Sequence, residues 1–169
     1  EYDADDMEVI GTIPADIEGI YVRNTENPVH QPIGRYHPFD GDGMLHMMRF
    51  SGGKAVYKNR FVRTNGFQAE AEAGEALWAG FTVPPVKSKR PGCGIGSHMR
   101  DSSSTDVLVR NGKILSTFWQ CGDGYLLDPE SLDTLGIEEW TPVEGLSAHP
   151  KHDPKTGELM FFNYGDKAP

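Results

Sequence analysis

Turn-forming residues interrupt this chain at short intervals, and that spacing limits the fold to one built from short strands. The clearest case is the segment 106–119, in which two apolar runs flank Asn111-Gly112. Asn-Gly is typical of a type I′ turn, because both central residues of that turn need positive φ. The pattern therefore predicts an antiparallel hairpin with strands at 106–110 and 113–119.

Three further segments repeat this design, with two apolar runs joined through turn residues. They lie at 44–62 around Gly52-Gly53, at 124–136 around Asp128-Pro129-Glu130, and at 149–164 around 153–157. Helix-favouring residues are confined to 69–78, where Gly74 and Gly80 keep the predicted helix short. The connector 84–96 shows no hydrophobic period. Successive hairpins with little helix predict an all-β fold, which could be a sandwich, a barrel or a propeller.

The size and composition are those of a single folded segment, 1–169. Of the 169 residues, 37% are hydrophobic and 24% are charged, which supports a folded core rather than disorder. No apolar run approaches the roughly 18 residues of a membrane span, so an integral membrane protein is not expected. The net charge of −9 argues against a nucleic-acid partner, since such proteins usually carry a basic face.

The cysteines and the chain ends bear on the cellular compartment and on whether this chain is part of a longer protein. Cys93 and Cys121 could form one bridge at most, and neither lies in a CxxC pair, so a disulfide framework and a thiolate zinc site are not expected. Reduced thiols fit a reducing compartment, and we expect a cytoplasmic protein. The acidic residues 1–6 lack the basic region of a secretory signal. Because the chain starts without Met and stops at an unstructured-looking 165–169, we expect it to be part of a longer protein.

The histidines are the first candidates for chemistry. No pair has the i, i+4 helical spacing of a metalloprotease site, and His149 and His152 are three apart, which places them on opposite faces of a strand. For most of them a structural role is the expectation. His149 differs because small residues precede it and Pro150 follows, which favours an extended backbone and a fixed ring, as a metal ligand needs. The six are His30, His37, His46, His98, His149 and His152.

The segment Phe39-Asp40-Gly41-Asp42-Gly43-Met44 has two interpretations. Asp-x-Asp-Gly resembles the start of a calcium loop, but the twelfth position from Asp40 is Ser51 instead of Glu. No helix follows the glycines, so a phosphate site is also poorly supported. A tight turn leading into a strand at Met44 is the interpretation that we adopt. The sequence has no Gly-x-Ser-x-Gly motif, and Cys121 with a distant histidine does not establish a nucleophile.

Five motifs, taken in order, resemble the N-terminal part of the carotenoid cleavage oxygenases. The last of them, Ser147-Ala148-His149-Pro150-Lys151, resembles the segment that bears the first iron-binding histidine of that family. The correspondence runs from about residue 8 to residue 165. The four earlier motifs lie at 11–14, 19–24, 39–46 and 59–64.

This resemblance implies a seven-bladed β-propeller with ferrous iron, Fe(2+), held on its axis by four histidines. It also implies cleavage of a conjugated C=C bond by O₂, which gives two carbonyl products from a carotenoid, an apocarotenoid or a stilbene. Only His149 is carried over as a metal ligand, because His37 and His46 lie in or beside a motif that does not supply ligands. The other three histidines and their supporting glutamates are expected beyond Pro169.

The size of the chain qualifies these implications. Propeller blades take about 40–45 residues each, so 169 residues supply four blades at most. A partial propeller exposes unpaired strand edges, and one imidazole cannot hold iron alone, so the segment by itself is expected to be inactive and prone to aggregate without the remaining blades.

Peripheral membrane contact is left open. The alternatives are a non-catalytic propeller that binds a partner, and an isomerohydrolase on the same scaffold. Phe118, Trp119 and Phe161-Phe162 are expected to pack between blades rather than line a substrate tunnel.

Overall fold

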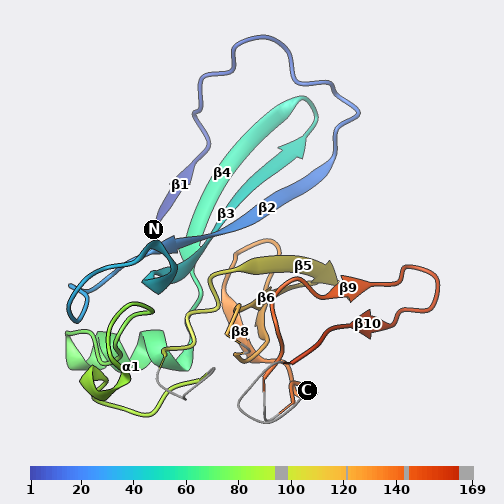
Figure 1. The fold of residues 1–169 in the computed structure, drawn as a ribbon. Helices are drawn as coiled ribbons and strands as arrows, with labels where there is room; N and C mark the ends of the chain where they lie inside the picture. Colours follow the sequence, from blue (N-terminus) through green and yellow to red (C-terminus); the bar gives the residue numbers. More distant parts are fainter. Residues whose placement is uncertain (94–98, 121, 143–144, 164–169) are drawn as a thin grey trace.

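The computed structural model describes residues 1–93, 99–120, 122–142 and 145–163 (Figure 1). Strands make up most of its regular structure, together with one α-helix and two short 3₁₀ helices. In chain order the elements are β1 (Tyr2–Ala4), β2 (Gly19–Asn27), η1 (Pro38–Asp40), β3 (Asp42–Ser51), β4 (Lys54–Phe61), α1 (Asn65–Ala73), η2 (Pro85–Lys87), β5 (Asp106–Arg110), β6 (Lys113–Thr117), β7 (Tyr125–Leu127), β8 (Thr134–Ile137), β9 (Lys151–His152) and β10 (Leu159–Met160). Within these described residues, no helix is both long and apolar enough to cross a membrane.

The strands form two four-stranded antiparallel sheets and one small hairpin. The first sheet has the order β1-β4-β3-β2, so its outer strand comes from the start of the chain. The second sheet, β5-β6-β7-β8, is a simple meander, and β9 pairs with β10. Strands β2 and β5, which are the first strands of the two meanders, contact each other, and the two sheets stand side by side in Figure 1. Separate four-stranded meanders with neighbouring first strands are the blades of a β-propeller.

The predicted hairpins are confirmed by the strand pairing. Asn111 and Gly112 have φ values of 50° and 71°, as a type I′ turn requires, and Arg110 pairs with Lys113 across them. Gly52-Gly53 likewise joins β3 to β4. The last hairpin is much shorter than predicted, because only two residues on each side are paired and residue 164 lies outside the described part.

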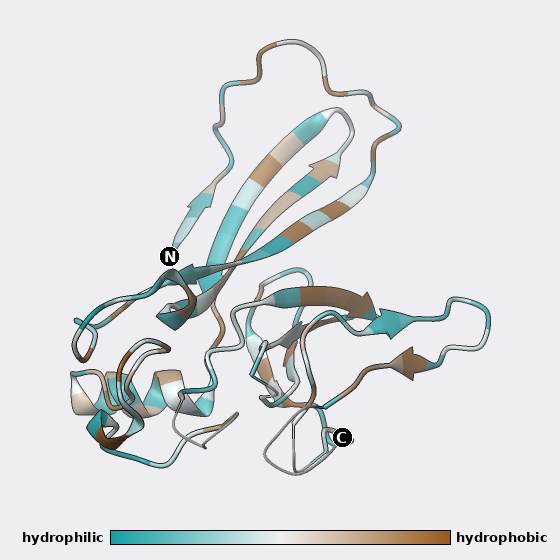
Figure 2. Cartoon of the chain, in the orientation of Figure 1, coloured by the Kyte–Doolittle hydropathy of each residue, from teal (hydrophilic) through white to brown (hydrophobic). Residues whose placement is uncertain are grey.

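The core lies between the two sheets. Leu45 and Met47 alternate along β3, so both point from the same face of the first sheet, and Ile114 and Leu127 meet them from the second. Figure 2 shows apolar residues alternating with polar ones along the long strands. The buried cluster therefore holds one blade against the next. Its members are Leu45, Met47, Val62, Ile114, Tyr125, Leu127 and Leu132.

The helix occupies residues 65–73, so it begins four residues before the helix-favouring segment 69–78, while the prediction that Gly74 keeps it short is confirmed. Thr64 begins it, because its side chain accepts a hydrogen bond from the Phe67 amide at 2.9 Å. Gly74 ends it with a φ of 69°, the left-handed conformation that is common after a helix C-terminus. The helix-favouring residues after Gly74 leave the helix, since the Leu77 amide donates to Glu70 Oε1 at 2.8 Å.

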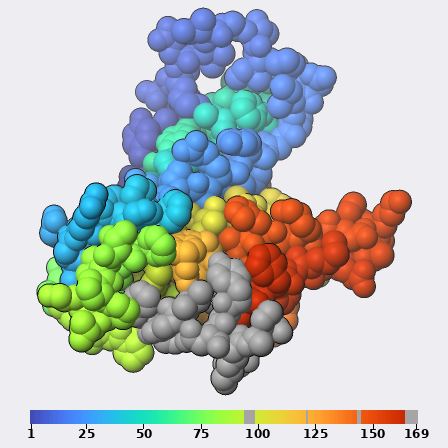
Figure 3. Space-filling view, in the orientation of Figure 1, coloured from blue at the N-terminus to red at the C-terminus, as the bar shows by residue number. Residues whose placement is uncertain are grey.

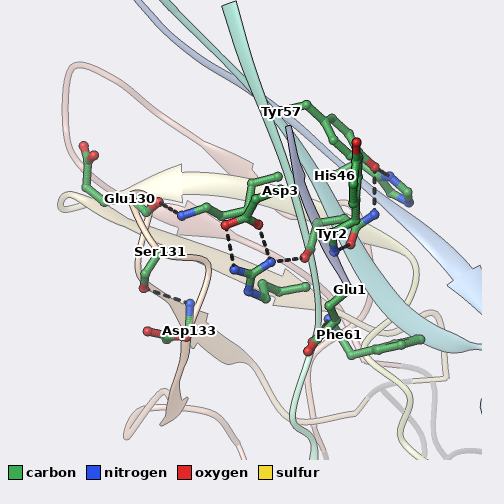
Figure 4. Close-up of polar contacts among 12 residues, drawn as sticks. Glu1, Tyr2, Asp3, His46, Tyr57, Phe61, Glu130, Ser131 and Asp133 are labelled. Atoms are coloured by element: carbon green, nitrogen blue, oxygen red, sulfur yellow. Dashed lines mark hydrogen bonds and ion pairs between the residues drawn. The ribbon is translucent and has the colours of Figure 1, made fainter. Parts of the chain in front are cut away.

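A chain of hydrogen bonds crosses the first sheet through His46. Asn59 Nδ2 donates to the Tyr57 hydroxyl at 2.9 Å, and that hydroxyl lies 2.5 Å from His46 Nδ1 (Figure 4). His46 Nε2 lies 2.9 Å from Thr25 Oγ1, which donates to the Met44 carbonyl at 3.2 Å. Tyr57 therefore donates to Nδ1 and Nε2 donates to Thr25, an arrangement that suits the neutral imidazole. Burial, and secondly the charge of Arg23, lower the pKa of His46.

We expect the contribution of His46 to the free energy of unfolding to decrease as the pH falls below about 6.5, the ordinary histidine pKa. In this range the unfolded chain takes up a proton at His46 that the folded chain resists, so acid favours unfolding. Denaturant unfolding at pH 5.5 and pH 8 measures the effect in the wild type and in His46→Asn, which should show a smaller loss. His152→Asn is the control, since that ring is exposed. An equal loss in the wild type and His46→Asn would contradict the assignment.

Candidate functional site

His149 lies at the surface, in the turn between the second sheet and β9. Its side chain is 66% exposed, and its Nδ1 lies 3.0 Å from Asp106 Oδ2. Figure 3 shows that the β9–β10 hairpin, which His149 leads into, projects from the body of the molecule. The imidazole is thus held on one side through Nδ1, while the ring as a whole is accessible.

The extended backbone predicted at His149 is wrong, because its φ is 61°. Both flanks are fixed: the Ser147 amide donates to the Phe162 carbonyl at 3.2 Å, and Lys151 pairs with Met160. The chain must turn between these two points, and His149 takes the left-handed conformation to do so. This conformation costs an ordinary residue about 1–2 kcal/mol. Strained backbone of this kind is common at functional sites.

The residues before His149 are buried, although its own ring is not. Ser147 is 1% exposed and Ala148 is 7% exposed, and the Leu146 amide donates to the Gly122 carbonyl at 2.9 Å. Small residues there allow the chain to pass close to the second sheet. The backbone that carries the imidazole is therefore anchored in the core.

The other described histidines have structural surroundings. His37 Nδ1 accepts a hydrogen bond from the Phe39 amide at 3.1 Å and so caps η1. His46 belongs to the hydrogen-bond chain described above, His30 lines a narrow pocket beside η1, and His152 is exposed on β9. Two candidates from the sequence, His98 and Cys121, lie outside the described residues. The described part of the chain contains no group of three or more His, Cys, Asp or Glu side chains placed to hold a metal ion.

The Asp40–Gly43 segment is a structural junction. Asp40 accepts hydrogen bonds from the His37 amide at 2.8 Å and the Phe81 amide at 2.7 Å. Asp42 Oδ2 accepts from the Val29 amide at 3.1 Å, while its Oδ1 lies 3.1 Å from Arg100 Nη1. Since protein donors engage both carboxylates, the turn interpretation fits the structure, and β3 begins at Asp42 instead of the predicted Met44.

Gly43 brings the first sheet into backbone contact with the segment that leads to β5. A Cβ atom at this position would lie 2.4 Å from the Ser103 carbonyl oxygen and 2.6 Å from that of Ser102. The Gly43 amide donates to the Ser102 carbonyl at 3.0 Å, and its own carbonyl accepts from the Val62 amide at 2.8 Å. Only glycine allows this approach.

Buried charges surround the same junction. Arg100 pairs with Glu70 of α1 and with Asp42, and the three side chains are 11%, 2% and 3% exposed. Arg100 Nη2 also donates to the Asp40 carbonyl at 3.1 Å. The next residue, Asp101, accepts hydrogen bonds from the amides of Ser103 and Asp123, and its burial raises the pKa of its carboxyl to about 7. These contacts stabilise the junction between the blades.

The aromatic residues named from the sequence divide into two groups. Phe118 is 1% exposed, and Trp119 packs between it, Phe39 and Phe81 with ring centroids 5.2–5.9 Å apart. Packing was the expectation for these two. Phe161 and Phe162 are 37% and 63% exposed, and Phe161 contacts Trp140 at 6.0 Å.

Comparison with known proteins shows what this chain is similar to. The model of the family described as retinal pigment epithelial membrane protein (RPE65) matches residues 1–169. Resveratrol cleavage oxygenase 1 of Chaetomium globosum is 35% identical over 95% of this chain and 27% of its own length. Carotenoid 9,10(9',10')-cleavage dioxygenase 1 of Arabidopsis thaliana is 31% identical over 97% of this chain and 33% of its own length. The crystal structure of Pseudomonas brassicacearum lignostilbene dioxygenase superposes with a TM-score of 0.80 at 27% identity, covering 97% of this chain and 34% of that one. The chain thus spans about a third of the length of these relatives.

Proposed function

Because this chain belongs to the RPE65 family, whose model matches residues 1–169, and is similar to resveratrol and carotenoid cleavage oxygenases, we propose that the full-length protein cleaves a conjugated C=C bond with O₂. The substrate class is a carotenoid, an apocarotenoid or a stilbene, and the products are two carbonyl compounds. The observation that carries the proposal is the likeness to lignostilbene dioxygenase over 97% of the chain at a TM-score of 0.80. The names of the resveratrol and carotenoid relatives support the same reaction class.

We include ferrous iron in this proposal, with His149 as one of its ligands. The donor chemistry fits, since imidazole nitrogen suits iron and the contact between Nδ1 and Asp106 leaves Nε2 available. The described residues hold no complete metal cluster, so the remaining ligands would come from other parts of the longer protein. When bound, the iron would supply the redox chemistry that activates O₂.

The chain itself would contribute position rather than bond cleavage. The anchored segment 146–148 fixes the backbone before His149, and the core between the sheets fixes the strands that carry this segment. A metal ligand needs such support because small displacements weaken both affinity and geometry. The remaining blades would complete the site and exclude water from it.

His149→Ala in the full-length protein tests the proposal. We expect bound iron and product formation each to fall at least about tenfold, because the alanine side chain has no atom that can bind the metal. Measured on the iron-free proteins, the melting temperature should stay within a few degrees of the wild type, since among the described residues the side chain is mostly exposed. The measurements are iron per protein after anaerobic reconstitution, and carbonyl product formed from a stilbene and from an apocarotenoid.

His152→Ala is the matched control, because that ring is three residues away and exposed. It should keep both iron and activity. Normal iron content in His149→Ala would assign His149 a structural role. Product that carries no label from ¹⁸O₂ would exclude cleavage by O₂ and favour an isomerohydrolase, while a full-length protein that binds no iron would favour a non-catalytic propeller.

A further inference from the structure

We propose that Asp106 is a positioning residue for His149, which holds the imidazole in the tautomer and orientation that present Nε2 to the metal. This inference rests on the proposed function, because it assigns the partner of the proposed ligand. Its basis is a contact between residues 43 positions apart: His149 Nδ1 lies 3.0 Å from Asp106 Oδ2.

Asp106 is held more rigidly than His149. It is the first residue of β5 and pairs with Thr117 in the ladder with β6. The Thr117 hydroxyl also donates to the Asp106 carbonyl at 3.4 Å. His149 lies in a turn with a φ of 61°, so its ring takes its direction from a group on a neighbouring strand.

The geometry fixes which nitrogen is free. A carboxylate accepts but does not donate, so Nδ1 carries the proton in this contact and the lone pair lies on Nε2. Histidines that bind metals usually donate their other N–H to a carboxylate or a carbonyl, which orients the ring and increases its basicity. The Asp106–His149 contact has this form.

The contact also joins the second sheet to the segment that leads into the β9–β10 hairpin. Strand β5 begins the second sheet and contacts β2 of the first, whereas His149 leads into β9. Asp106 therefore couples the ligand position to the blade that precedes it. An ordinary surface ion pair would contribute slightly to stability and nothing to iron affinity. A loss of iron affinity therefore distinguishes a positioning residue from an ordinary ion pair.

Asp106→Ala and Asp106→Asn in the full-length protein test this role. We expect Asp106→Ala to bind Fe²⁺ about 10- to 100-fold more weakly, the usual effect of losing such a partner. The amide oxygen of asparagine can still accept a hydrogen bond from Nδ1–H. Asp106→Asn should therefore recover most of the affinity for Fe²⁺. Affinity is measured anaerobically by competition with a chelator, together with the melting temperature of each variant. Glu139→Ala is the control, since it removes an exposed negative charge from the same part of the chain.

The outcomes separate this inference from the proposed function. A loss of iron in Asp106→Ala that Asn restores, at an unchanged melting temperature, supports the positioning role. Wild-type affinity in Asp106→Ala, while His149→Ala has lost iron, overturns the inference and leaves the function intact. A loss that follows a lowered melting temperature and is not restored by Asn also overturns it, in favour of a structural role. Normal iron binding in His149→Ala rejects His149 as a ligand and the positioning role with it, whereas a full-length wild type that binds no iron rejects the proposed function.

Discussion

Replacing Gly43 with alanine is expected to destabilise the protein by about 3 kcal/mol, because overpacking a tight backbone contact and weakening its hydrogen bond add up. The new Cβ would lie 2.4 Å from the Ser103 carbonyl oxygen. The atoms in its way are backbone, so no side chain can rotate to make room. Relief would require moving β3 away from the segment before β5, which would also lengthen the 3.0 Å hydrogen bond from the Gly43 amide to Ser102. Urea unfolding of the full-length protein measures the change.

Gly52→Ala is the matched control for this prediction. Gly52 lies in the turn after β3, and a Cβ atom there would meet nothing within 4 Å. Its φ of 55° makes alanine cost about 1 kcal/mol through backbone strain alone. If Gly43→Ala destabilises no more than Gly52→Ala, the two blades are not in close backbone contact at this point.

Local signals explain why the hairpins could be predicted from the sequence. A two-residue turn such as Asn111-Gly112 determines both its own φ values and the pairing of the strands beside it, so the prediction needs no distant partner. The same reasoning predicted a turn that leads into β3, but it placed the start of that strand two residues late. It placed the helix wrongly because the decisive signal was the capping side chain of Thr64, not the helix-favouring residues after it.

Long-range partners were not accessible to this reasoning. Strand β1 pairs with β4 more than fifty residues away, and no local pattern indicates that a start-of-chain segment will fill the outer position of a sheet. The contact between Asp106 and His149 is of the same kind. The motif order identified His149 as a candidate, but only the fold shows which side chain touches its ring, and it shows that the backbone there turns instead of running extended.

The Asp40–Gly43 segment shows how a motif can be prominent without chemistry of its own. Two carboxylates and two glycines in alternation resemble a ligand loop. In the structure each carboxylate accepts backbone hydrogen bonds, and the glycines let main chains approach closely. Spacing alone cannot distinguish these uses, because both need oxygens and small residues at the same positions.

The second large effect is expected at Arg100, where substitution by methionine should cost about 3–5 kcal/mol. Methionine fills much of the same volume but leaves the carboxylates of Glu70 and Asp42 buried without their cation. The helix is affected too, since Gly66 of α1 packs against the aliphatic part of Arg100. Lys89→Met is the control: its pair with Glu75 is 45% and 60% exposed and should contribute at most about 1 kcal/mol.

A double variant distinguishes the loss of the cation from the loss of packing. Glu70→Gln retains an oxygen that can accept from the Leu77 amide, as Glu70 Oε1 does at 2.8 Å, but carries no charge. If the unpaired carboxylate causes most of the cost, then Arg100→Met with Glu70→Gln should be less destabilised than the sum of the single variants, because one buried charge has been removed. Strict additivity in urea unfolding would instead mean that Arg100 acts mainly through its other contacts, with Asp42, the Asp40 carbonyl and Gly66 of α1. In that case the charge of Glu70 would not be what holds the helix to the junction between the blades.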